Sequence, residues 1–150
     1  MNNDGLPDIV VSSKYFSTTV KERINVFTNQ YQDSGIAFSK TWSRDVGMAT
    51  AVELADINGD GYDDLIYSGI QEDATGMALY YPDIYIHQSD SNGPSTEPSA
   101  DWSFDGHSWI GYVWGIEAGD LNNDGNLDLI ISATFTSFFL FNDGTGGLDV

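Results

Sequence analysis

One stretch decides the fold: Asp56-Ile57-Asn58-Gly59-Asp60-Gly61-Tyr62-Asp63-Asp64, followed at once by Leu65-Ile66-Tyr67. The same pattern returns as Asp120-Leu121-Asn122-Asn123-Asp124-Gly125-Asn126-Leu127-Asp128, followed by Leu129-Ile130-Ile131. A third copy, which lacks the leading Asp, reads Asn2-Asn3-Asp4-Gly5-Leu6-Pro7-Asp8 before Ile9-Val10-Val11. The Asp at the fifth position recurs at residues 4, 60 and 124. The chain is therefore built from repeats.

The segments between the copies have the pattern of short strands. They are β-branched, or they alternate between apolar and polar residues, with Gly and Asp turns between them. We expect these further strands near residues 24–27, 36–42, 49–55, 84–87, 102–104, 112–118, 138–141 and 148–150. Residues 71–82 and 89–100 are polar or Gly/Pro-containing and predict loops. About four strands per repeat, without a helical period, predict an all-β fold made of four-stranded antiparallel propeller blades.

The repeat boundaries divide the chain into blades. They predict a partial blade over residues 1–44, a second over about 45–108 and a third over about 109–150. This amounts to a partial propeller of about 2.5–3 blades, whereas propellers contain about 4–8. We therefore expect the chain to be a piece of a longer reading frame, or to close by association with copies of itself or with a partner.

The repeated motif has the chemistry of a cation site. Side chains at positions 1, 3 and 5 can converge when the chain turns, Gly at position 6 permits the turn, and Asp at position 9 closes the site. An all-oxygen ligand set selects Ca²⁺ over softer metals, and Mg²⁺ prefers a tighter octahedron with several waters. The first complete site comprises Asp56, Asn58, Asp60, Asp64 and the carbonyl of Tyr62. The second comprises Asp120, Asn122, Asp124, Asp128 and the carbonyl of Asn126. A partial third comprises Asn2, Asp4, Asp8 and the carbonyl of Leu6.

Two other kinds of loop have a similar sequence pattern. An EF-hand loop carries Glu at position 12 between two helices, but position 12 is Val11, Tyr67 and Ile131 in the three copies. A plain hairpin turn also uses Asp-Gly. Two complete copies before matching strands disfavour that alternative, which stays open for residues 2–8.

Charge and composition exclude several classes. The 150 residues carry a formal net charge of -18. All five basic residues lie within residues 1–44, which have a net charge of +1, and residues 45–150 have a net charge of -19 without Lys or Arg. Such a chain repels phosphate backbones, so we expect no nucleic-acid partner. The absence of Cys excludes thiolate chemistry. No apolar run reaches the roughly 18–20 residues of a membrane span.

These segments resemble the FG-GAP/VCBS-type repeats of integrin-like β-propellers. Residues 56–66 match the calcium loop of that family, and Phe141-Asn142-Asp143-Gly144-Thr145-Gly146 resembles its hairpin between the third and fourth strands of a blade. The resemblance implies that each calcium loop joins the first and second strands and that the ion is structural. It also implies a secreted or cell-surface location and a role in adhesion.

We therefore expect a non-catalytic, calcium-binding extracellular module for interaction or structure, with a protein or glycan partner and no catalytic residues. The alternative is a carbohydrate-handling propeller, either lectin-like or a fragment of a calcium-dependent polysaccharide lyase. A lyase needs a base, and the absence of Lys and Arg from residues 45–150 weakens that alternative. We expect structural roles for His87 and His107, and packing roles for Trp42, Trp102, Trp109 and Trp114.

Overall fold

The computed structural model describes residues 4–13, 24–31, 35–46, 48–70, 83–95, 102–104, 110–145 and 147–149. Thirteen strands lie within these ranges. The first six are β1 (Ile9–Ser12), β2 (Ile24–Asn29), β3 (Phe38–Arg44), β4 (Met48–Ala55), β5 (Asp64–Ile70) and β6 (Asp83–His87). The others are β7 (Ser89–Asp90), β8 (Gly93–Pro94), β9 (Trp102–Phe104), β10 (Val113–Gly119), β11 (Asp128–Ala133), β12 (Ser137–Asn142) and β13 (Leu148–Asp149).

The strands form three main sheets and a small hairpin. The first sheet has the order β1-β2-β3, the second β4-β5-β6-β9 and the third β10-β11-β12-β13, while β7 pairs with β8. Every strand pair is antiparallel. The prediction of an all-β fold with four-stranded antiparallel sheets is thus confirmed. Each sheet resembles a propeller blade because its strands follow one another in chain order.

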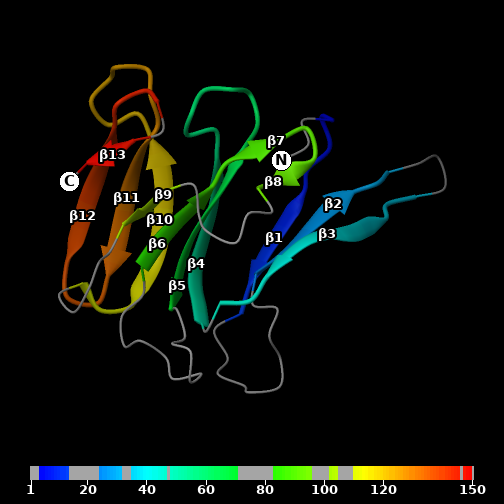
Figure 1. Cartoon of the computed structure of the whole chain (residues 1–150), viewed down its shortest axis with the longest axis horizontal. Coiled ribbons are helices and arrows are strands. Elements are labelled where there is room, and N and C mark those ends of the chain that lie inside the picture. The colour runs from blue at the N-terminus through cyan, green and yellow to red at the C-terminus, as the bar shows by residue number, and fades with distance from the viewer. Residues whose placement is uncertain are drawn as a thin grey trace.

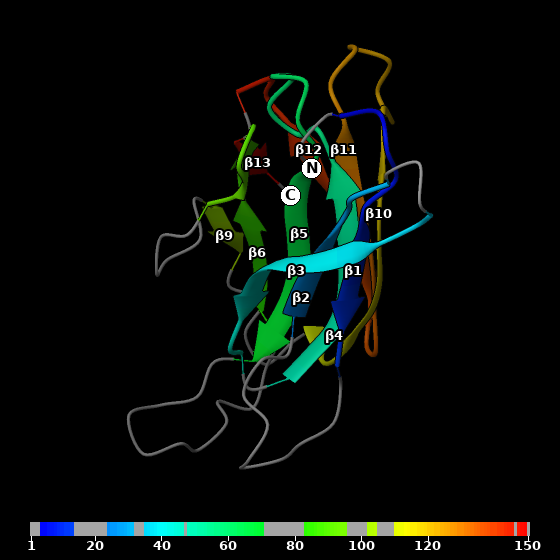
Figure 2. The same cartoon turned by 90° about the vertical axis from the view of Figure 1, so that its right-hand side faces the viewer.

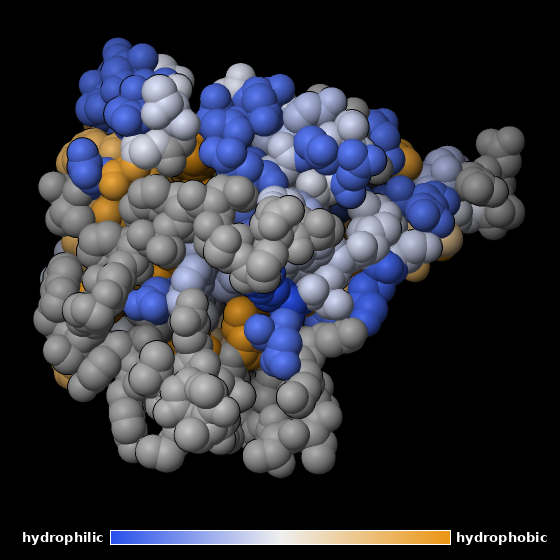
Figure 3. All heavy atoms as spheres, in the orientation of Figure 1, coloured by the Kyte–Doolittle hydropathy of each residue, from blue (hydrophilic) through white to orange (hydrophobic). Residues whose placement is uncertain are grey.

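The three sheets lie side by side, with the second between the other two (Figure 1). Strand β4 contacts both β1 and β10, so the sheets meet along their early strands. Figure 2 views the same arrangement from the side of the first sheet. The turns between β4 and β5 and between β10 and β11 project from one end of the sheets, where hydrophilic residues gather (Figure 3). The acidic motifs occupy these turns.

Two apolar cores hold neighbouring sheets together. One core lies between the first and second sheets and includes Val26, Trp42, Leu65 and Tyr67. The other lies between the second and third sheets and includes members such as Ile66, Ile86, Leu129 and Leu140. Successive side chains of a strand point to opposite faces, so Leu65 and Ile66 of β5 enter different cores. This explains why every residue of β5 is buried.

One region differs from the loop predicted over residues 89–100. Within it, Ser89 and Asp90 pair with Pro94 and Gly93 in the short hairpin β7–β8. Two-residue strands have no detectable apolar period, so the sequence pattern cannot show them. The predicted loop at residues 71–82 and the residues His107 and Trp109 lie outside the described residues.

Candidate metal centre

The acidic motifs form three related turns. We name them turn 1 (described from Asp4 to Asp8), turn 2 (Asp56 to Asp64) and turn 3 (Asp120 to Asp128). Turn 2 joins β4 to β5 and turn 3 joins β10 to β11. Each turn therefore leads into the strand whose apolar residues fill the cores.

The first Asp of each complete turn closes the loop onto its own backbone. In turn 2, the Asp56 carboxylate accepts hydrogen bonds from the N–H of Asp60 at 2.9 Å and of Gly61 at 2.8 Å. In turn 3, Asp120 accepts the corresponding bonds from Asp124 at 3.1 Å and Gly125 at 3.0 Å. The same residue type thus organises both loops in the same way.

Positions 3 and 5 extend this pattern. In turn 2, the Asp60 N–H also donates to Asn58 Oδ1 at 3.0 Å, so oxygens of Asp56 and Asn58 meet at one donor. Asp60 Oδ1 then accepts the Tyr62 N–H at 2.9 Å.

Turn 3 reproduces both of these bonds. The Asp124 N–H donates to Asn122 Oδ1 at 2.9 Å, and the Asn126 N–H donates to Asp124 Oδ1 at 2.8 Å. The predicted ligand side chains at positions 1, 3 and 5 are therefore brought around one short stretch of backbone in each turn.

The Asp at position 9 connects the turn with the end of the third strand of the sheet. Asp64 is fully buried and accepts the N–H of Ile57 at 3.2 Å and of Ser89 at 2.8 Å. Ser89 begins β7, just after β6, so one carboxylate connects the turn with the end of the third strand of its sheet.

Asp128 is buried in the same way in turn 3. It accepts the N–H of Leu121 and of Asn142, both at 2.9 Å. Asn142 is the last residue of β12, which is the third strand of its sheet.

Within the described residues, turn 1 makes two hydrogen bonds that correspond to bonds in turns 2 and 3. The Leu6 N–H donates to Asp4 Oδ1 at 2.9 Å, as Tyr62 and Asn126 do in the other turns. The Asn29 N–H donates to Asp8 Oδ1 at 2.9 Å, as Ser89 and Asn142 do. Asn2, the remaining predicted side-chain ligand of this turn, lies outside the described residues.

Glycine at position 6 is required by the backbone. Gly5, Gly61 and Gly125 adopt φ angles of 81°, 91° and 93°, a left-handed region that side chains disfavour. The prediction that these glycines permit a sharp turn is confirmed.

Burial sets the protonation of the inner carboxylate. Desolvation raises the pKa of Asp64 to about 6, the N–H groups of Ser89 and Ile57 lower it, and the charges of Asp60 and Asp56 raise it further. At the surface, the N–H of Asn126 and the amide of Asn122 lower the pKa of Asp124. A buried carboxylate beside two others is stabilised in its charged form by a nearby cation.

The donor set fits a hard cation, although its carboxylates are not gathered at one point. Among the described residues, no group of three or more Asp, Glu or His side chains is close enough to hold a metal ion in this conformation. The carboxylates instead accept backbone N–H groups. Each carboxylate oxygen has a second lone pair for a ligand bond, and positions 1, 3, 5 and 9 supply oxygen donors only.

Asn142 is a residue that the sequence reading missed. Its Nδ2 donates to the carbonyl of Ile57 at 2.6 Å and of Leu127 at 3.0 Å, and so connects turn 2 of one sheet with turn 3 of the next. Its Oδ1 accepts the Gly144 N–H at 3.0 Å. The only signal in the sequence is that Asn29 and Asn142 both end the third strand of a repeat.

The described aromatic residues divide into buried and exposed ones. His87 is fully buried, its Nε2 lies 3.3 Å from the Tyr67 hydroxyl, and its ring stacks on that of Tyr67. Trp42 is also buried and donates from Nε1 to the Ser95 carbonyl at 3.1 Å. These contacts place His87 and Trp42 in packing positions. Trp114, in contrast, is 54% exposed, which differs from the packing role expected for it.

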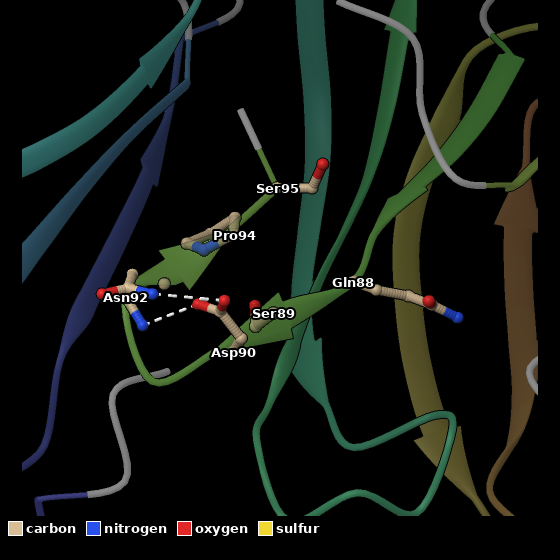
Figure 4. A pocket seen from close by; sticks show the side chains of 7 residues that line it. Gln88, Ser89, Asp90, Asn92, Pro94 and Ser95 are labelled. Atoms are coloured by element: carbon tan, nitrogen blue, oxygen red, sulfur yellow. Dashed lines mark hydrogen bonds between the residues drawn. The ribbon is translucent and has the colours of Figure 1, made fainter. Parts of the chain in front are cut away.

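A polar pocket lies beside the β7–β8 hairpin (Figure 4). It has a volume of about 440 Å³. Asp90 accepts hydrogen bonds from the backbone N–H of Asn92 at 2.7 Å and from its side-chain amide at 3.2 Å. The lining residues are Gln88, Ser89, Asp90, Asn92, Gly93, Pro94 and Ser95.

Sheets of this order, each entered through the same acidic turn, define a repeat protein of blade-like antiparallel sheets. The sequence model of the FG-GAP-like repeat family matches residues 1–67, which include turn 1, the first sheet and turn 2. Residues 1–67 are therefore similar to an FG-GAP-like repeat, and the resemblance seen in the sequence is confirmed for this part of the chain. No curated protein matches the chain. Within the described residues, no helix has the length and apolarity needed to cross a membrane.

Proposed function

We propose that the chain is a calcium-binding segment of a β-propeller and acts as a non-catalytic module for interaction or structure on the outside of the cell. Turn 2 and turn 3 each hold one Ca²⁺ in this proposal. The ligands are oxygens of positions 1, 3, 5, 7 and 9, and turn 1 offers a partial site of the same kind.

The repeated hydrogen-bond network carries this proposal. Turns 2 and 3 share no more than a nine-residue pattern, yet every side chain proposed as a ligand makes the same bond in both. A plain hairpin needs only one or two specialised residues. The repeated set of three carboxylates and one carboxamide supports a cation site.

Electrostatics explain what a cation would do for the fold. Two carboxylates about 4 Å apart repel by roughly 4 kcal/mol at an effective dielectric near 20. Two divalent ions would change the formal charge of the chain from -18 to -14. The charge repulsion within each turn would then become attraction. Part of the folding free energy would thus be calcium-binding free energy.

The position of each turn explains how local binding would stiffen the sheet. Asp64 and Asp128 each connect the turn with the end of the third strand in the same sheet. A cation held beside these carboxylates would fix the first three strands relative to one another. This supports a structural ion in a rigid scaffold.

The polar pocket beside the β7–β8 hairpin favours a second candidate function. Its amide, hydroxyl and carboxylate groups match the hydroxyls of a sugar, which supports a lectin-like module of the same fold. A glycan array tests this alternative directly, with Asp90→Ala as the variant that should lose binding. Turnover of an acidic polysaccharide to an unsaturated product would instead indicate a lyase.

Calorimetric titration and thermal melts test the proposed calcium sites. We expect two calcium ions to bind per chain with measurable heat. Calcium at about 1,000 times its dissociation constant adds about 4 kcal/mol per site, and each kcal/mol shifts the Tm of a chain this long by about 2–4 °C. With two sites, excess EDTA should therefore lower the Tm by about 16–32 °C. A melt unchanged by EDTA would contradict the proposal.

A further inference from the structure

Two Asn-Gly pairs occur in the chain, at residues 58–59 and 92–93. Asparagine is a thermolabile residue, because the backbone nitrogen of the residue that follows can attack its side-chain Cγ. Glycine places no side chain beside that nitrogen, so an Asn-Gly pair offers the least hindrance to the attack. The first pair lies in turn 2 and the second in the β7–β8 hairpin, where the surroundings differ.

In turn 2, the carboxamide of Asn58 is held at both ends by Asp60. Asn58 Oδ1 accepts the Asp60 N–H at 3.0 Å, and Asn58 Nδ2 donates to Asp60 Oδ2 at 3.1 Å. Attack at Cγ puts negative charge on Oδ1, and an N–H group already aimed at that oxygen stabilises this charge. Gly59 is exposed in a turn that projects from the end of the sheets (Figure 1). Turn 2 thus combines an activated carbonyl with an accessible glycine.

The pair in the hairpin is less open to the reaction. Gly93 is buried and belongs to β8, where it pairs with Asp90. Its nitrogen would have to leave the hairpin before it could attack the Asn92 side chain. The Asn92 carboxamide is exposed and donates to Asp90 Oδ2 at 3.2 Å (Figure 4). Exposure of the asparagine is therefore not enough when the glycine after it is buried.

Turn 3 contains the same asparagine in the same hydrogen bonds. Asn122 Oδ1 accepts the Asp124 N–H at 2.9 Å, and Asn122 Nδ2 donates to Asp124 Oδ2 at 2.8 Å. The next residue is Asn123, whose φ angle of 63° is close to the 72° of Gly59. The Asn123 side chain crowds its own backbone nitrogen and so hinders attack on Asn122. Turn 3 is thus a natural control for position 4 of the motif.

We propose that Asn58 is a site of spontaneous deamidation, with water as the only co-reactant. The Gly59 nitrogen forms a bond to Asn58 Cγ, the Cγ–Nδ2 bond breaks, and the Gly59 N–H proton leaves with Nδ2 as ammonia. Water then adds to one carbonyl of the cyclic imide and breaks the bond between that carbonyl and the Gly59 nitrogen. Attack at the side-chain carbonyl gives aspartate, and attack at the main-chain carbonyl gives isoaspartate. Nothing is oxidised or reduced.

Deamidation changes the charge of turn 2. The new carboxylate replaces the Nδ2 group that donates to Asp60, so a hydrogen bond becomes a repulsion between two carboxylates. The metal-free turn should therefore become less stable. In calcium, the additional carboxylate would be attracted to the cation, a consequence that rests on the proposed function.

Peptide mapping by mass spectrometry of the complete chain, incubated in EDTA, tests the proposal. Deamidation raises the mass of a peptide, whereas isomerisation of an aspartate does not. In the folded chain, we expect Asn58 to react about ten-fold faster than Asn92 or Asn122, which corresponds to a barrier lower by about 1.4 kcal/mol. In denaturant, where the fold no longer distinguishes the two Asn-Gly pairs, Asn58 and Asn92 should react at similar rates.

Exchange of position 4 between the two turns gives matched variants. Gly59→Asn should slow the reaction of Asn58 about ten-fold, and Asn123→Gly should accelerate that of Asn122 by the same factor. A Cβ at position 59 would meet no atom within 4 Å, so the new side chain has room. Both residue types tolerate the left-handed backbone, so circular dichroism should show the same fold for both variants.

Two results would overturn the proposal. One is an Asn92 that reacts as fast as Asn58 in the folded chain. The other is a rate at Asn58 that Gly59→Asn leaves unchanged, because the Gly59 nitrogen would then be unimportant for the reaction. Both rates come from the same peptide maps.

Thermal melts of Asn58→Asp, which mimics one product, test the consequence. Its Tm should fall in EDTA, and the loss should be smaller in millimolar calcium. Asn92→Asp makes the same change beside Asp90 outside the motifs, so calcium should not alter its effect. If calcium left the loss in Asn58→Asp unchanged, the result would count against the proposed function and leave the deamidation site standing.

Discussion

Turn 2 and turn 3 have the same internal structure and different surroundings. Their carboxylates accept the same backbone N–H groups, with distances that differ by 0.3 Å or less. Yet the third sheet covers Ile57 of turn 2, whereas Leu121 of turn 3 is 41% exposed. The comparison shows that nine local residues are enough to form the turn. Whether its apolar residue at position 2 is buried depends on the neighbouring sheet.

The largest expected effect is on the feature that the two turns share. Asp60→Ala and Asp124→Ala should each lower the free energy of unfolding in millimolar calcium by about 4 kcal/mol, because each removes a ligand of a proposed calcium site. Asp90→Ala, outside the motifs, should cost about 1 kcal/mol or less. Chemical denaturation with and without calcium measures these values. Equal effects of all three substitutions would mean that the turns are ordinary hairpins.

The next effect separates the two turns. Ile57→Ala should lower the free energy of unfolding by about 3 kcal/mol, since it leaves a cavity between two sheets. Leu121→Ala should change it by no more than about 0.5 kcal/mol. Chemical denaturation measures both values. A large effect of Leu121→Ala would show that turn 3 has support that the described residues do not provide.

The link between the turns should have a smaller effect. Asn142→Ala removes the hydrogen bonds to the Ile57 and Leu127 carbonyls and should cost about 2 kcal/mol. Asn92→Ala, at an exposed turn, is the matched control and should cost about 0.5 kcal/mol or less. In metal-free protein, hydrogen exchange of turn 2 should accelerate in Asn142→Ala. If hydrogen exchange of turn 2 were unchanged in Asn142→Ala, the hydrogen bond from Asn142 would not stabilise turn 2.

The smallest effect concerns the glutamates on β4 and β10. Burial, and then the charge of Glu117, raises the pKa of Glu53 above 4.5. The neutral form is therefore favoured in the folded state, and its stabilisation is present below pH 4.5 and lost as the pH rises through the raised pKa. Glu53→Gln should raise the Tm slightly at pH 7 and leave it unchanged near pH 4. Asp149→Asn removes one negative charge from an exposed position and is the control. If it raised the Tm at pH 7 as much as Glu53→Gln does, the burial of Glu53 and its repulsion from Glu117 would not be the cause.

Local features of the molecule could be predicted from sequence. The turns and the strands that follow them were predictable because Asp, Asn and Gly act within nine residues, and because Leu65-Ile66-Tyr67 and Leu129-Ile130-Ile131 are strongly apolar. The strand predicted near residues 49–55 is Met48–Ala55, and that predicted near 112–118 is Val113–Gly119.

Features that depend on distant contacts could not be predicted. Ile57 and Leu121 look alike in sequence, and only the neighbouring sheet makes one of them buried. Asn142 and Ile57 are 85 residues apart, so no local pattern reveals their hydrogen bond. The β7–β8 hairpin has strands too short to produce a period.

Position 4 of the motif has a consequence for how such repeats diverge. Gly59 occupies it in turn 2 with φ 72°, and Asn123 occupies it in turn 3 with φ 63°. Asparagine tolerates this conformation better than almost any other side chain. Gly and Asn can therefore replace one another at position 4 at little cost in stability. A β-branched residue there would strain the backbone. A search profile that insists on glycine there would overlook genuine members of the repeat.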